Sequence, residues 1–142
     1  MIVGSLTKVF ACPGLRVGYI VAPDRAMASE LSRHQPEWSV NALACALVPE
    51  LLKQADLPAW VTAIRAARVE LVELLVSYDL SPDPSDTNFV LLRQAPGLRA
   101  HLACAAVLVR DTTNFGFDGG VRIAVPDAPG LDRLANALKG YR

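Results

Sequence analysis

The chain has 142 residues, of which 52% are hydrophobic and 20% are charged, and this composition predicts a globular protein with a sizeable core. Basic and acidic side chains number 14 each, so the charge balance argues against a nucleic-acid surface. Cys12, Cys45 and Cys104 form no C-x-x-C pair, which argues against a zinc site or a disulfide framework and favours a reducing, cytoplasmic setting. We expect no signal peptide, because the N-terminus lacks a basic stretch followed by an apolar core. We expect no membrane span, because no apolar run reaches about 18 residues.

The first half of the chain predicts two short strands followed by helices. Residues 1–4 predict the tail of a strand, and the apolar residues 15–22 predict a buried strand. Asp24 is placed to cap a helix over residues 25–34. Ser39 is expected to cap a second helix that is apolar on more than one face, which predicts burial nearly all round and a kink or break at Pro49.

The second half predicts a long helix and then alternating strands and helices. The helix over residues 57–78 is the clearest, with these side chains on or near one stripe: Val61, Ile64, Arg68, Leu71, Val72 and Leu75. After a loop at 81–86, strands are expected over 87–92, 106–110 and 121–125, and helices over 98–104 and 130–138. This alternation indicates a compact α/β arrangement.

Residues 5–19, SLTKVFACPGLRVGY, are the most informative segment of the chain. Ser5 and Thr7 stand just before Lys8, a Pro-Gly turn follows, and Arg16 comes eight residues after the lysine. The segment resembles the cofactor-lysine loop of the pyridoxal-phosphate enzymes of the class I/II aminotransferase superfamily. The resemblance implies that Lys8 forms a Schiff base with the cofactor and then moves the Cα proton of the substrate. It further implies that Ser5, Thr7 and Arg16 bind the cofactor phosphate, and that Gly18 lets the backbone pass closely.

The same residues also satisfy the S-x-x-K pattern of serine β-lactamases and penicillin-binding proteins. No K-T-G follows anywhere in the chain, and Pro13-Gly14 stops the long helix that this pattern requires. The pyridoxal-phosphate interpretation is therefore preferred.

Three segments of the second half extend the resemblance. TNFVLL at 87–92 resembles a strand of the histidinol-phosphate aminotransferase-like branch, AVLVRD at 106–111 resembles a strand that ends in Arg-Asp, and GGVRIAV at 119–125 resembles the strand of the substrate-carboxylate arginine. By this resemblance Arg122 binds the substrate carboxylate with both guanidinium nitrogens. Arg110 is expected at a substrate phosphate, and Asn88 is a further substrate-binding residue. No residue is expected to bind a metal.

QPEWSVNALA at 35–44 resembles a segment of the cobalamin-biosynthesis members, which are similar to threonine-phosphate decarboxylase. This implies decarboxylation of L-threonine O-3-phosphate to aminopropanol phosphate. A histidinol-phosphate-type aminotransferase remains the alternative, because both reactions use the same electron sink and differ only in which bond at Cα breaks.

The resemblance covers only the C-terminal part of the family pattern. It implies an α/β fold made of the end of the cofactor-binding large domain (1–36), connecting helices (37–78) and a complete small α/β domain (79–142). Four features should precede Lys8 and do not: a glycine-containing phosphate turn, an aromatic ring stacked on the cofactor, an Asn at its 3-hydroxyl and an Asp at its pyridine nitrogen. We therefore expect the isolated chain to bind pyridoxal phosphate weakly or not at all and to have little activity.

The incomplete large domain also predicts an exposed apolar face, made by Val17, Tyr19, Val21, Leu43 and Leu47. Such a face calls for a second copy of the chain in a homodimer or for a complementing N-terminal chain. An inactive fragment that works only as an interaction module is the non-enzymatic alternative.

Overall fold

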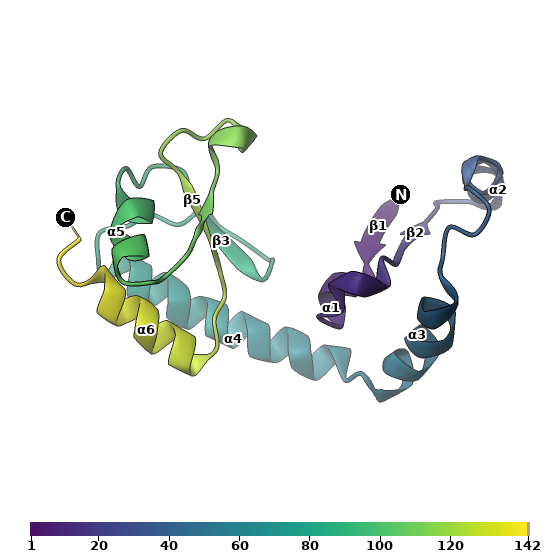
Figure 1. The fold of residues 1–142 in the computed structure, drawn as a ribbon, viewed down its shortest axis with the longest axis horizontal. Helices are drawn as coiled ribbons and strands as arrows, with labels where there is room; N and C mark the ends of the chain where they lie inside the picture. The colour runs from purple at the N-terminus through teal and green to yellow at the C-terminus, as the bar shows by residue number, and fades with distance from the viewer. Residues whose placement is uncertain (142) are drawn as a thin grey trace. The chain divides into compact units, whose positions relative to one another are not determined.

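The computed structural model describes residues 1–141 and confirms the α/β class (Figure 1). The chain divides into two compact units, one formed by Met1–Asp56 and the other beginning at Leu57. The division lies within the segment 37–78, which the sequence indicates as connecting helices. Each unit holds its own antiparallel sheet.

The unit Met1–Asp56 is built on a two-stranded sheet. Strand β1 (Ile2–Ser5) pairs with β2 (Gly18–Val21), so that Ser5 lies opposite Gly18. The single-turn helix α1 (Leu6–Val9) and a 3-10 turn (Pro13–Leu15) fill the connection between the strands. Helix α2 (Arg25–His34) has the predicted bounds, and its predicted cap is confirmed, because the Asp24 carboxylate accepts a hydrogen bond from the Met27 amide at 2.8 Å.

Helix α3 (Ala42–Gln54) differs from the prediction in three respects. Its N-cap is Asn41 rather than Ser39, since the Asn41 side chain accepts a hydrogen bond from the Ala44 amide at 2.9 Å. The helix is continuous across Pro49, so the predicted break is not found. Ala44 is its only buried residue, so burial nearly all round is wrong.

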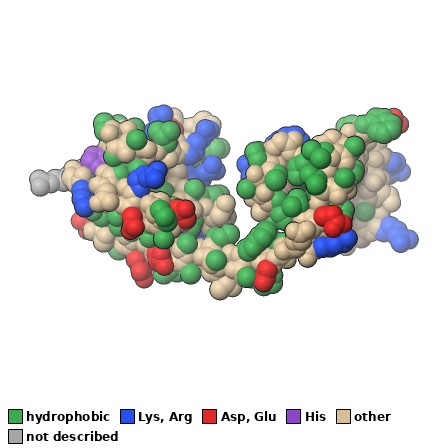
Figure 2. Space-filling model, turned by 60° about the horizontal axis from the view of Figure 1, so that its bottom comes forward, with side chains coloured by type: hydrophobic (Ala, Val, Ile, Leu, Met, Phe, Trp, Pro, Cys, Tyr) green, Lys and Arg blue, Asp and Glu red, His purple; other side chains and the backbone are tan. Residues whose placement is uncertain are grey.

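The prediction that β2 is buried is also wrong, since all four of its residues are exposed. Its sheet has only two strands, and within residues 1–141 no third strand extends it. The exposed apolar face is confirmed for Tyr19, Val21, Leu43 and Leu47, whereas Val17 is half-buried. Figure 2 shows hydrophobic side chains gathered on the surface of this unit.

The second unit contains the larger core. Helix α4 (Leu57–Val76) is followed by β3 (Phe89–Leu92), α5 (Leu98–Cys104), β4 (Arg110–Asp111), β5 (Val121–Ala124) and α6 (Ala128–Leu138). The strand order is β3-β5-β4, and both pairs are antiparallel. The best-buried side chains come from all three helices and two of the strands: Leu71, Leu75, Val90, Leu92, Leu98, Leu102, Val121, Ile123, Leu134 and Leu138.

Strand geometry decides which side chains of this sheet remain available. Successive residues of a strand point to opposite faces, so Val90, Leu92, Val121 and Ile123 face the core. Their neighbours of opposite parity, among them Phe89 and Arg122, therefore lie on the other face. The sheet thus carries Arg122 on a rigid support.

Two expectations for this unit need correction. The strand predicted over 106–110 is reduced to Arg110–Asp111, because the turn after α5 places Ala106 at a φ of 56° and leaves Leu108 exposed. The predicted stripe of α4 is buried only at Leu71 and Leu75, while Val61 and Ile64 are exposed.

Candidate active site

The lysine loop is held closed by main-chain hydrogen bonds. The Leu6 amide donates to the Val17 carbonyl at 3.2 Å, and the Cys12 amide donates to the Thr7 carbonyl at 3.0 Å. The hydroxyls of Ser5 and Thr7 are hydrogen-bonded to each other at 2.7 Å, with Thr7 buried. Lys8 follows Thr7 on the same helical turn and is exposed. Two hydroxyls and an amine are therefore presented by four consecutive residues.

Arg16 follows the predicted Pro-Gly turn. Residues Pro13–Leu15 form a 3-10 turn, and Arg16 ends it with φ 47° and ψ 52°, in the left-handed region. This conformation costs a non-glycine residue about 1–2 kcal/mol. It is stabilised by the Arg16 guanidinium, which donates to the Pro13 carbonyl at 3.1 Å. A Cβ on Gly18 would lie 2.7 Å from the Gly4 carbonyl oxygen, so the predicted close backbone approach is confirmed.

Asn41 ties the lysine loop to the start of α3, a contact that the sequence did not predict. Its side-chain amide donates to the Leu15 carbonyl at 2.9 Å across 26 sequence positions, while its oxygen caps α3. Leu15 directly precedes Arg16 and is itself buried. The only signal in the sequence is an Asn ahead of an apolar helix, which indicates a cap but not a long-range bond.

Replacing Asn41 by Ala is expected to loosen the lysine loop. The cap and the Leu15 bond are both lost, and the amides of Cys12 and Leu15 should exchange hydrogen faster as the loop opens. Asp24→Ala is the matched control, because it removes an N-cap of α2 and touches nothing in the loop. Each variant should lose about 1 kcal/mol of helix capping. Equal exchange at Cys12 and Leu15 in the two variants would refute the role given to Asn41.

A hollow of about 720 Å³ lies in the same unit, beside the two-stranded sheet and α2. Arg16, Gly18 and Tyr19 line it, and Lys8 does not. The structure therefore groups Ser5, Thr7, Lys8 and Arg16 on one loop without enclosing the lysine in this hollow. The amine of Lys8 is therefore exposed to solvent and can be reached by a ligand.

Arg110 and Arg122 form a pair in the second unit. Their Cα atoms are register partners on β4 and β5, so both guanidinium groups extend from adjacent positions of the sheet. Like charges directly opposite each other destabilise an antiparallel pair. The centre of the Phe89 ring lies 4.7 Å from the guanidinium carbon of Arg122, and the centre of the Phe115 ring lies 5.6 Å from that of Arg110. These cation–π contacts offset part of the repulsion between the two arginines. An anion bound between them would offset it more fully.

Asp111 attracts Arg110 through its charge, but its ion pair is with Arg99. The Thr113 amide donates to its carboxylate at 2.7 Å, and this bond, with that of the Thr113 hydroxyl, lowers the pKa of Asp111; Arg99 and Arg110 lower it further. The carboxylate is ionised and pairs with Arg99 at 3.1 Å. Among residues 1–141, Arg110 and Arg122 make no ion pair with a carboxylate, so the two cations are available to a ligand.

Asn88 lies immediately before β3 and is exposed. Its carbonyl accepts a hydrogen bond from the Val125 amide at 2.9 Å, which fixes its backbone beside β5. The structure thus places Asn88, Arg110 and Arg122 in one unit and the four residues of the lysine loop in the other.

Other kinds of site find no support in the part of the chain that the structure describes. That part has no group of three or more His, Cys, Asp or Glu side chains that could hold a metal ion. Its helices are also too short or too polar to cross a membrane. The functional groups that remain are the lysine loop and the arginine pair.

Comparison with known proteins gives these two groups a context. Residues 1–138 match the family model "Aminotransferase class I and II". The chain is 36% identical to a threonine-phosphate decarboxylase of Salmonella typhimurium, with 95% of this chain and 39% of the relative covered. It is 31% identical to a histidinol-phosphate aminotransferase of Thermoanaerobacter pseudethanolicus, with 98% and 40% covered. A histidinol-phosphate aminotransferase structure from Clostridium acetobutylicum superposes with a TM-score of 0.81 at 27% identity, over 97% of this chain and 44% of that one.

The chain belongs to the aminotransferase class I and II family, whose members use pyridoxal phosphate. It spans about two fifths of the length of the curated relatives that it matches. The family expected from the lysine loop and the three strand segments is thereby confirmed. Relatives of both the decarboxylase and the aminotransferase kind match at similar identity.

Proposed function

We propose that this chain is the C-terminal part of a pyridoxal-phosphate enzyme that decarboxylates L-threonine O-3-phosphate. The observation that carries the proposal is the loop in which an exposed Lys8 follows the paired hydroxyls of Ser5 and Thr7, in a chain of this family. The unpaired cysteines agree with a reducing, cytoplasmic setting.

The residues of the lysine loop fit the cofactor by their chemistry. Lys8 offers an exposed amine to the cofactor aldehyde. Ser5 and Thr7 offer two hydroxyl groups whose oxygens lie 2.7 Å apart. Arg16 adds an exposed guanidinium for the phosphate. When bound, pyridoxal phosphate supplies an electron sink for the charge that develops at the substrate Cα. Lys8 then holds or delivers the proton at that carbon.

The arginine pair suits a substrate with two anionic groups. In this proposal Arg122 binds the carboxylate with two parallel hydrogen bonds, because its planar guanidinium matches that geometry. Arg110, one strand away, binds the substrate phosphate, and Asn88 contributes a side-chain amide. L-threonine O-3-phosphate carries both a carboxylate and a phosphate. In the reaction the bond from Cα to the carboxylate breaks, CO₂ leaves, and Cα gains a proton.

A histidinol-phosphate-type aminotransferase is the second candidate, favoured by the 31% identical relative that bears this name. The segment 35–44 and the higher identity of the decarboxylase relative support the first candidate. The two reactions diverge only in which bond at Cα is held perpendicular to the cofactor ring.

We further propose that the exposed apolar side chains of the unit Met1–Asp56 form an interaction surface. The exposed Tyr19, Val21, Leu43 and Leu47 would pack against a complementing N-terminal chain or a second copy in a homodimer. In this division residues 1–36 belong to the large domain, 37–78 connect the domains, and 79–142 form the small domain.

An activity assay tests the proposal. The chain is combined with pyridoxal phosphate and with the N-terminal part of the Salmonella relative that precedes the matched region, and O-phospho-L-threonine is added. The proposal predicts release of CO₂ that is lost in Lys8→Ala. Glutamate-forming exchange with L-histidinol phosphate and 2-oxoglutarate would instead establish the aminotransferase. If a folded, assembled complex catalyses neither reaction, the chain is an interaction module and not part of an active enzyme.

A further inference from the structure

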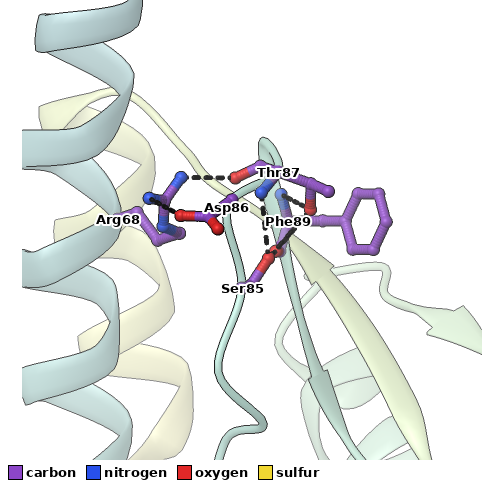
Figure 3. Close-up of polar contacts among 5 residues, drawn as sticks. All are labelled: Arg68, Ser85, Asp86, Thr87 and Phe89. Atoms are coloured by element: carbon purple, nitrogen blue, oxygen red, sulfur yellow. Dashed lines mark hydrogen bonds and ion pairs between the residues drawn. The ribbon is translucent and has the colours of Figure 1, made fainter. Parts of the chain in front are cut away.

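Arg68 makes a long-range contact that the proposed chemistry does not use. It lies on α4, and one of its guanidinium nitrogens donates to the Thr87 carbonyl at 2.7 Å, across 19 sequence positions. A second nitrogen lies 3.8 Å from the Asp86 carboxylate. Figure 3 shows the Arg68 side chain reaching from the helix to the turn that precedes β3.

The burial of Arg68 indicates that this contact is a built feature. Its side chain is only 12% exposed, whereas the Asp86 side chain is fully exposed. A guanidinium taken out of water loses hydration, which hydrogen bonds must offset. Both partners of Arg68 belong to the same turn, so this largely buried side chain holds that turn to the helix.

Hydrogen bonds also fix the turn at residues 85–87 to Phe89, the first residue of β3. The hydroxyls of Ser85 and Thr87 donate to the Phe89 carbonyl at 2.7 and 3.0 Å, and the Thr87 amide donates to the Ser85 hydroxyl at 3.1 Å (Figure 3). Because these bonds surround residue 88, the peptide that carries Asn88 has little freedom. A fixed Thr87 carbonyl therefore fixes Asn88 and Phe89 together.

Phe89 connects this turn to the arginine pair. Its ring lies 4.7 Å from the guanidinium carbon of Arg122, at the diagonal position of the antiparallel β3–β5 pair. Contacts thus run from Arg68 through Thr87 to Phe89, and from Phe89 to Arg122. Each of these residues lies in the unit that begins at Leu57.

We propose that Arg68 is a positioning residue for the substrate-binding arginine. By holding the Thr87 carbonyl it sets the exposed amide of Asn88 and keeps the Phe89 ring against the guanidinium of Arg122. The part of this role that concerns substrate rests on the proposed function. Lysine would serve less well at position 68, because a single ammonium lacks the planar fork that reaches both Thr87 and Asp86.

Nuclear magnetic resonance of the full chain tests the role of Arg68. The Nε–H signal of Arg122 carries a ring-current shift from Phe89, and Phe89→Leu gives its value without the ring. We expect Arg68→Met to move this signal most of the way toward the Phe89→Leu position, and Arg68→Lys to move it part of the way. Arg65→Met is the matched control, because Arg65 is an exposed residue of the same helix, and it should leave the signal unchanged.

Titration with O-phospho-L-threonine gives the second readout. Arg68→Met should bind it roughly tenfold more weakly than Arg65→Met, as expected for a displaced binding group. An Arg122 signal that is unchanged in both Arg68 variants would overturn the positioning role. If Arg68→Met unfolds, the Arg68→Lys variant decides by the same signal. If the wild-type chain does not bind O-phospho-L-threonine, the substrate assignment fails, while the Arg122 signal still decides the role of Arg68.

Discussion

Replacing Arg122 by Gln is expected to weaken binding of O-phospho-L-threonine by about a hundredfold, because the charged, bidentate contact that we propose with the carboxylate is lost. Arg122 lies on the central strand, is supported by Phe89 and has no carboxylate partner among the described residues. Isothermal titration of the variant and the wild-type chain measures the difference.

The fold should survive this substitution. Removing one of two opposed cations relieves repulsion with Arg110, while loss of the Phe89 contact costs about 0.5–1 kcal/mol. Arg122→Lys keeps the charge and should retain part of the affinity. Arg133→Gln, an exposed arginine on α6, is the control and should bind as the wild type does. Equal affinities for Arg122→Gln and Arg133→Gln would contradict the assignment of the carboxylate site.

Replacing Lys8 by Ala is expected to remove the borohydride-stable adduct that we propose between pyridoxal phosphate and the lysine loop. An alanine has no amine to condense with the aldehyde, so the loss at this position is complete. Peptide mass spectrometry after reduction measures it. Weak, reversible binding through Ser5, Thr7 and Arg16 should remain, because none of these three proposed phosphate ligands is altered.

Two variants control the Lys8 experiment. Lys53→Ala removes an exposed lysine that is paired with Glu50, and it should leave the adduct at Lys8 intact. Thr7→Val keeps the lysine but removes the buried hydroxyl that we propose for the phosphate, and it should lower labelling of Lys8. Undiminished labelling of Lys8 in Thr7→Val would show that the loop has no phosphate site.

Local signals in the sequence were sufficient for several elements. The bounds of α2 and α5 and the Asp24 cap follow from periodicity and cap chemistry, which act within a few residues. The residue types of the lysine loop and of the three strand segments also indicate the family, which the match over residues 1–138 confirms. These features depend little on distant parts of the chain.

Contacts between distant residues could not be predicted in the same way. The bond from Asn41 to Leu15 and the bond from Arg68 to Thr87 each join two elements, and no periodicity reports such a pairing. The register that sets Arg110 opposite Arg122 depends on the short strand β4, for which the sequence predicts a longer strand over 106–110. The exposure of β2 likewise depends on which strands flank it and not on its own apolar residues.

The most direct measurement is a map of reductive labelling on the three lysines of the chain, Lys8, Lys53 and Lys139, with pyridoxal phosphate and with pyridoxal. Our account predicts low total labelling, with Lys8 preferred over the other two, because Thr7 and Arg16 hold the phosphate near its amine. Pyridoxal, which lacks the phosphate, should remove this preference. Equal labelling of the three lysines by pyridoxal phosphate would contradict a cofactor site at Lys8.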